Sequence, residues 1–290
     1  MKNILWVGLI LSILMISGCE KTEEAAAFGE FSLNVKHEVE GEALKTDALI
    51  YTNQAGNRYM ITEIQWFISD VQLINKDGEA VGITQNVDEN IFYIDTDIEE
   101  THTIKSSYPI PSGNYSGIRF TFGLDKEANK SHRFVNPPES FMFWPDYLGG
   151  GYHYMKLNGK WINKAGANEP FNFHLGIGQE YYDGEKYGND LFEFGDRSNY
   201  QHCEGYLPPQ KLNTVTAFIH NNFSLELPLN FTIEADETTH LDFIMAIEKW
   251  FYGYQIYDHD VWGGAIMQQQ EAMDVACRNG VDVFSLRPAK

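Results

Sequence analysis

The sequence is short of positive charge. It carries 21 Lys and Arg residues against 41 Asp and Glu residues, which gives a formal net charge of −20 over 290 residues. A chain this acidic lacks the basic surface that binds nucleic acid or anionic membranes. Hydrophobic residues nevertheless make up 43% of the chain and charged residues 21%, which is the balance of a globular protein rather than of a disordered or fibrous one.

The common catalytic motifs are also missing. The sequence has no GxSxG, no HExxH, no P-loop and no GxGxxG at the start of a helix. The run Gly149-Gly150-Gly151 follows no predicted strand and is interpreted as a flexible turn. Carboxylate pairs are frequent, but a chain with 41 acidic residues contains such pairs by chance, so they do not support a glycosidase. We therefore expect a protein without intrinsic catalysis.

No apolar run is long enough to span a membrane. The longest, from Ile4 to Ile16, is shorter than the roughly 20 residues that a spanning helix needs and follows a single Lys. It ends in Ile16-Ser17-Gly18-Cys19, which resembles a bacterial lipobox, with Cys19 as the lipid-modified residue. We predict a signal peptide over residues 1–18, a tether over 19–27 and one domain over 28–290. A plain secretory signal is the alternative.

Cysteine is scarce. Once Cys19 is assigned to the lipid, only Cys203 and Cys277 remain. In an exported protein such a pair predicts one disulfide, with two reduced buried cysteines or two soft metal ligands as alternatives. The absence of CxxC and CxxxC spacing argues against a structural zinc or iron–sulfur site.

Most of the chain shows the alternating pattern of strands. Phe31, Leu33, Val35 and His37 alternate with polar residues, and the stretch from Tyr59 to Ile74 changes phase at Ser69-Asp70, which indicates a bulge or a turn. Further strands are predicted at 91–94, 116–123, 152–157, 171–175, 214–220, 224–227, 230–233 and 241–247. One C-terminal helix is predicted over 264–278. The fold class is all-β: a single elaborated antiparallel β-sandwich with long loops and a short C-terminal helix.

Soft and aromatic side chains gather near histidines in and beside the long loops 136–151 and 176–191. Met142 and Trp144 lie in the first loop, His153 follows it, and His174 precedes the second. Imidazole and thioether groups are preferred copper ligands, so a copper site on a β scaffold is chemically reasonable. Each of these residues taken singly is more typical of a protein core.

The arrangement as a whole resembles the MbnP-like copper-binding family, whose genes lie beside those for methanobactin and a di-haem peroxidase. The resemblance covers nearly the whole mature chain and rests on the segments 33–37, 51–56, 64–70, 110–115, 122–125, 142–144, 151–159, 173–176 and 266–284. It implies that copper binds through histidines and that a Trp, oxidised to kynurenine by a di-haem partner, contributes to the site. The matching residues are His37, His174 and Trp144, with Met142 beside them.

The chain departs from the family pattern just after Trp144. Asp146 stands where the family has a second Trp, Pro145 precedes it, and the loop is about two residues longer. The departure argues against the oxidation of Trp144 more than it argues against the fold.

We predict that His37 and His174 meet in one cavity with Trp144, with ring nitrogens within roughly 3 to 5 Å of each other. Alternation places His37 on the apolar face of its strand and His174 opposite Phe173. His153, His202 and His220 are further candidates.

The main functional hypothesis is a lipid-anchored copper-binding protein of the cell envelope, expected at the outer membrane, with a di-haem peroxidase-like protein as partner. Because neutral imidazoles would be the ligands, copper binding should weaken below about pH 6.5. The alternative is a metal-free module that binds glycan, peptide or a protein partner through the aromatic loops, using Tyr147, Tyr152, Tyr181 and Tyr182. A third reading is an enzyme whose site the sequence does not reveal.

Overall fold

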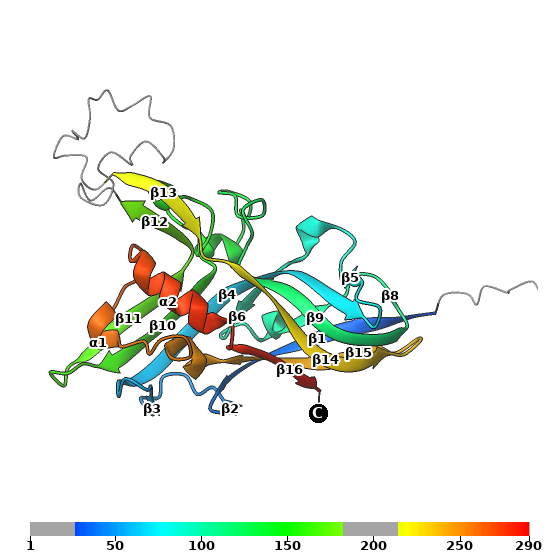
Figure 1. Cartoon of the computed structure of the whole chain (residues 1–290), viewed down its shortest axis with the longest axis horizontal. Helices are drawn as coiled ribbons and strands as arrows, with labels where there is room; N and C mark the ends of the chain where they lie inside the picture. The colour runs from blue at the N-terminus through cyan, green and yellow to red at the C-terminus, as the bar shows by residue number, and fades with distance from the viewer. Residues whose placement is uncertain (1–26, 182–213, 290) are drawn as a thin grey trace, which may run out of the picture.

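Two β-sheets account for most of the described chain, residues 27–181 and 214–289 of this computed structural model (Figure 1). The strands of the larger, eight-stranded sheet are β3 (Tyr51–Thr52), β4 (Arg58–Asn75), β5 (Ala80–Gly82), β6 (Ile91–Asp95), β9 (Gly113–Phe122), β10 (Met155–Ile162), β11 (Asn168–Leu175) and β14 (Phe223–Ile233). Its main path runs β11-β10-β4-β9-β14, and β3, β5 and β6 also pair with β4. The central strand β4 therefore fixes most of the architecture.

The smaller sheet has six strands around β1. They are β1 (Phe28–Val39), β2 (Glu42–Ala43), β7 (Thr103–Lys105), β8 (Ile110–Pro111), β15 (Thr238–Ala246) and β16 (Phe284–Pro288). A separate ribbon consists of β12 (Ile177–Tyr181) and β13 (Val215–His220). The helices among the described residues are α1 (His259–Trp262) and α2 (Gln270–Gly280), with 3₁₀ turns η1 (Val87–Glu89), η2 (Glu99–His102), η3 (Glu139–Met142), η4 (Asp146–Leu148) and η7 (Ile247–Phe251).

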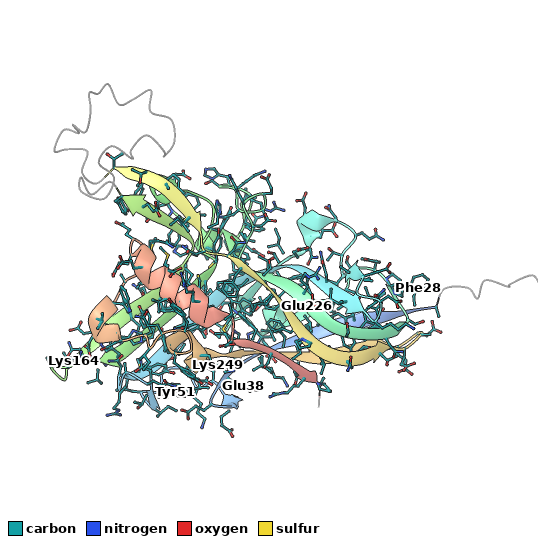
Figure 2. The ribbon with its side chains drawn as sticks, in the orientation of Figure 1. Phe28, Glu38, Tyr51, Lys164, Glu226 and Lys249 are labelled. Atoms are coloured by element: carbon teal, nitrogen blue, oxygen red, sulfur yellow. The ribbon has the colours of Figure 1, made fainter. Side chains whose placement is uncertain are left out.

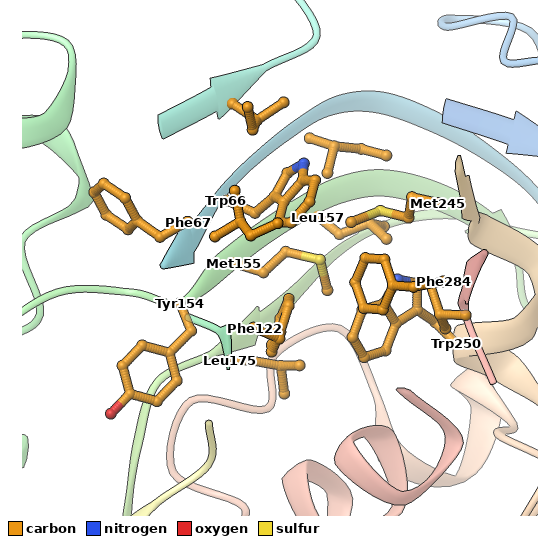
Figure 3. Close-up of a cluster of buried hydrophobic side chains, with 14 of the residues drawn as sticks. Trp66, Phe67, Phe122, Tyr154, Met155, Leu157, Leu175, Met245, Trp250 and Phe284 are labelled. Carbon is orange, nitrogen blue, oxygen red and sulfur yellow. The ribbon is translucent and has the colours of Figure 1, made fainter. Parts of the chain in front are cut away.

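The core lies between the two sheets and is rich in aromatic rings. Trp66 of β4 stacks against Phe122 of the same sheet and against Phe243 and Phe284 of the smaller sheet, with ring centroids 5.6 to 6.3 Å apart. Figure 3 shows Trp66 within this cluster, whereas the next residue, Phe67, points away from it. Strand alternation thus gives β4 one face toward the sandwich core and one face away from it. The all-β sandwich predicted from the sequence is confirmed.

The phase change in β4 is a bulge and not a turn. The strand is continuous from Arg58 to Asn75, but its pairing with β9 shifts between Ser69 and Gln72. Asp70 lies at the shift with φ at +51°, a backbone conformation typical of a bulge. In the same way, the two strands predicted at 224–227 and 230–233 are one strand, β14, with an irregularity between Pro228 and Phe231.

Two parts of the sheet prediction need correction. β1 and β15 pair in parallel, with Leu33 opposite Leu241, so not every pair of the sandwich is antiparallel. The predicted loop at 176–191 begins as strand β12, because residues 177–181 pair with β13 across a gap in sequence that no local pattern reveals. The remainder of that loop lies outside the described residues.

The C-terminal helix is shorter and later than predicted. It begins at Gln270 and includes Asn279, whose buried side-chain amide donates to the backbone oxygens of Trp250 and Gln255 instead of ending the helix. Cys277 donates from its Sγ to Asn221 O at 3.3 Å, and its disulfide stays a prediction. Its expected partner Cys203 lies outside the described residues, as does Cys19.

The described chain begins at one end of the long axis. Figure 2 shows Phe28, the first residue of β1, at the end opposite to Lys164 in the turn between β10 and β11. None of the helices in the described part of the chain combines the length and the apolar character that crossing a membrane requires.

Candidate metal centre

His174 lies on the outer face of the larger sheet. The cross-strand set Trp66–Met155–Leu175 points into the core, so the neighbouring set Gln65–Lys156–His174 points to the other face. His174 Nε2 lies 2.8 Å from Asn158 Oδ1, an oxygen that can only accept a hydrogen bond. Nε2 therefore carries the proton and Nδ1 carries the lone pair. That Nδ1 is buried and has no hydrogen-bond partner among the described residues.

The orientation of Asn158 is fixed from its other side. Asn158 Nδ2 donates to Glu63 Oε2 at 3.4 Å, which leaves Oδ1 facing the imidazole. A histidine whose second nitrogen is held by an amide or carbonyl oxygen has the arrangement that orients metal-ligating imidazoles.

His153 lies beside His174 and is oriented in the same manner. The two rings are 5.1 Å apart between centroids and nearly perpendicular, at 87°. His153 Nδ1 lies 2.9 Å from the carbonyl oxygen of Met142, which also accepts from the His153 backbone N–H at 2.6 Å. Because a carbonyl oxygen only accepts, Nδ1 carries the proton and Nε2 the lone pair. The pair thus presents one unprotonated nitrogen from each ring.

Trp144 closes the centre on the side of His153. Its fully buried ring lies 4.6 Å from the His153 ring at an angle of 71°, and its Nε1–H donates to Leu148 O at 3.1 Å. The loop between them returns at Gly149-Gly150-Gly151, where all three residues have positive φ, and Trp144 N donates to Gly151 O. This run, interpreted above as a flexible turn, has a defined conformation that non-glycine residues rarely adopt.

Gly176, the residue that follows β11, packs against the ring of Trp144, and this contact can be tested. A Cβ at this position would lie 2.7 Å from two ring carbons of Trp144. We expect Gly176→Ala to destabilise the protein by about 2 kcal/mol, since overfilling a packed site has costs of that order. Gly82→Ala on β5, where the nearest atom would be at 3.5 Å, is the control. Equal urea midpoints for the two variants would contradict the packing argument.

Both imidazoles are neutral at physiological pH. Burial lowers the pKa of His153 to about 3, with further lowering by His174 and Lys156 and partial opposition from the carbonyls of Met142 and Phe143. Burial and then the charge of Lys156 lower the pKa of His174 to about 4. Neutral imidazole is the form that binds metal ions, so no proton has to be displaced from the pair at pH 7.

His37 lies elsewhere, and the prediction of one cavity shared with His174 is wrong. His37 Nε2 accepts a hydrogen bond from Trp66 Nε1 at 3.0 Å, which places it on the core side of β4, whereas His174 lies on the outer side. Since the indole N–H can only donate, the Nε2 lone pair of His37 is already used. Sequence alternation assigned each histidine to the correct face of its own strand but could not place the strands relative to each other.

The remaining candidates divide into those at the centre and those away from it. The Met142 side chain is fully buried, and its carbonyl is the group that holds His153. His220 contacts Tyr154, with Nδ1 3.3 Å from the hydroxyl, and His202 lies outside the described residues. The only sequence feature that pointed to His153 as a site residue was its position next to Tyr152, directly after the long loop.

The aromatic residues proposed for a metal-free module differ in their exposure to solvent. Tyr147 is 72% exposed, but Tyr152 is buried and its hydroxyl bonds the backbone of Phe134. Tyr181 is partly buried, and Tyr182 lies outside the described residues. Tyr152 therefore offers no face on which a sugar ring could stack.

A group of carboxylates lies further along the outer face. Oxygens of Glu63, Asp95 and Asp97 lie within 4.8 Å of one another. Asp95 Oδ2 already accepts from Tyr93 and Gln65. These are hard oxygen donors, which suit ions such as calcium rather than copper.

Comparisons with known proteins agree with this architecture. A family model described as MbnP matches residues 28–268. The structure of MbnP from Methylosinus trichosporium superposes with a TM-score of 0.53 at 13% sequence identity, covering 91% of this chain and 99% of that one, a likeness that shows the fold. No curated protein matches the sequence. Because the family model spans more than half of the chain, this protein belongs to the MbnP family.

Proposed function

We propose that this protein binds a copper ion through His153 and His174, without catalysing a reaction of its own. The observation that carries the proposal is the buried Nδ1 of His174, which has no hydrogen-bond partner among the described residues and lies on a ring 5.1 Å from that of His153. An unpartnered buried nitrogen lowers stability unless something binds it. Two neutral imidazoles, each oriented by an oxygen on its other nitrogen, offer a ligand set that suits copper.

The surroundings of the pair support metal binding of a limited kind. Trp144 and the sheet cover the imidazoles, and within the described part of the chain their hydrogen-bond and ring contacts include no thiol or carboxylate. These residues would hold copper by nitrogen donation and would shield it from water. When bound, copper would supply redox or cargo chemistry, whereas the chain supplies orientation and burial.

The test is copper loading of the purified mature chain. We expect about one equivalent of copper to remain after dialysis, measured by elemental analysis, and His153→Ala and His174→Ala each to lose it. His240→Ala, which removes an exposed histidine of β15, is the control and should retain copper. Full retention by both site variants would reject the proposal.

The location and partner belong to the same proposal. The lipid at Cys19 would hold the protein through a short tether to Phe28, at one end of its long axis (Figure 2). Around the centre, Val135, Phe141 and Tyr147 are 65 to 76% exposed. Exposed apolar side chains grouped on one loop are typical of contact surfaces, which supports docking of a di-haem peroxidase-like partner beside Trp144.

A further inference from the structure

Lys156 brings a positive charge to the histidine pair. It lies directly opposite His174 in the pairing of β10 with β11, on the same face of the sheet. Its Nζ donates to the carbonyl oxygen of Phe141, the residue before Met142, whose own carbonyl orients His153. The side chain is thus tied to the loop on one side of the centre and to the strand on the other, and it cannot swing freely into solvent.

The ammonium acts on both imidazoles. Its charge is among the causes that lower the pKa of His153 and also that of His174. Burial lowers the pKa of Lys156 itself from its usual value, and the nearby carboxylate of Glu63 opposes that lowering. The hydrogen-bond and ring partners of the imidazoles, namely Met142, Asn158 and Trp144, are uncharged.

We infer that Lys156 makes this site select monovalent over divalent cations. The inference rests on the proposed function, because it concerns the cation held by His153 and His174. Repulsion from a fixed charge is proportional to the charge of the bound ion. Lys156 therefore opposes a divalent ion twice as strongly, in free energy, as a monovalent ion at the same place.

This proportionality has a consequence that does not depend on the local dielectric constant. If removal of the Lys156 charge tightens binding of a monovalent ion by a factor f, it must tighten binding of a divalent ion by f squared. For a charge on the order of 8 Å away at an effective dielectric constant of about 45, f is about 5 and its square about 25. A purely structural role of Lys156 would change both affinities by similar factors.

The experiment uses Ag⁺ and Zn²⁺ as redox-inert probes of the two charges. Dissociation constants are measured by competition titration for the mature chain and for Lys156→Gln, which removes the charge but keeps an N–H donor for Phe141 O. Lys156→Arg keeps the charge and should leave both constants unchanged. Lys156→Met is a second neutral variant, and urea midpoints show which variants are folded.

Zinc bound elsewhere must be separated from zinc at the centre. The carboxylates of Glu63, Asp95 and Asp97 are a second place where Zn²⁺ could bind, so only the binding lost in His153→Ala and His174→Ala is counted. We expect Lys156→Gln to tighten Ag⁺ about 5-fold and Zn²⁺ about 25-fold.

The two failures are distinguishable. Equal tightening of both ions, or none, in a folded neutral variant would overturn the role of Lys156 while histidine-dependent Ag⁺ binding still supports the proposed site. If the unmodified chain binds neither Ag⁺ nor copper, the proposed function and this inference both fall.

Discussion

Replacing His37 by alanine is expected to lower the free energy of unfolding by about 4 kcal/mol without removing copper. His37 is buried, with 8% of the residue exposed, and truncation of a buried side chain of this size costs roughly 2–4 kcal/mol. The change also leaves the Nε1–H of Trp66 without its acceptor inside the core, a loss of about 1–3 kcal/mol. Urea unfolding followed by tryptophan fluorescence gives the difference directly.

A matched variant separates the two contributions. His37→Gln keeps a hydrogen-bond acceptor that can meet Trp66 and should recover part of the lost stability, whereas His240→Ala on the exposed side of β15 should change little. Copper analysis of the same samples tests the assignment of His37 to the core. If folded His37→Ala loses copper while His153→Ala retains it, then His37 is a copper ligand and His153 is not.

Acid is expected to unfold the apo-protein well above the pH at which most carboxylates titrate. Four histidines have pKa values lowered chiefly by burial: His37 and His153 to about 3, His174 and His259 to about 4. In the unfolded chain each returns to about 6.5, so the unfolded state takes up more protons as the pH falls. Stability from these groups is complete above pH 6.5 and is lost below it.

The expected size of this effect is large. Each such histidine lowers the free energy of unfolding by about 2 kcal/mol between pH 7 and pH 5, and the four together approach the total stability of an ordinary domain. Urea midpoints measured from pH 7 to pH 5 should fall steeply. A midpoint that does not change over this range would show that these histidines are not buried in the neutral form.

His259 offers the control for the acid experiment. Its ring lies 4.4 to 5.6 Å from those of Phe171, Phe251, Tyr257 and Trp161, and neither ring nitrogen has a hydrogen-bond partner among the described residues. His259→Phe should therefore fit the aromatic cage and reduce the pH dependence by one proton.

Bound copper should protect against acid, because it binds only the folded state, and its release is expected near pH 4 rather than near 6.5.

The strands could be predicted from the sequence because their causes are local. Alternation of apolar and polar residues located β1 and β4, and a change of phase marked the bulge at Asp70. The same rule put His37 on a buried face and His174 on the face opposite Phe173. Each of these statements depends only on residues a few positions apart.

The metal centre could be predicted only in part because its causes are not local. Trp144, Met142 and His174 were identified through the family resemblance, and the structure brings all three to one place. The structure adds His153, whose role depends on the return of the loop at Gly149–Gly151 and on the pairing of β10 with β11. Which strand lies beside which is set by contacts between distant segments, and alternation carries no information about them.

The parallel pairing of β1 with β15 has a consequence for how the chain reaches this structure. Glu30 pairs with Thr238, so the first strand to be synthesised waits for a partner that is made about 200 residues later. Closing so long a loop is slow, and until then β1 presents an unpaired edge that can associate with other chains. The smaller sheet therefore cannot be completed until β15 has been synthesised. A fragment that ends before β15 should lack the pairing of β1 with β15.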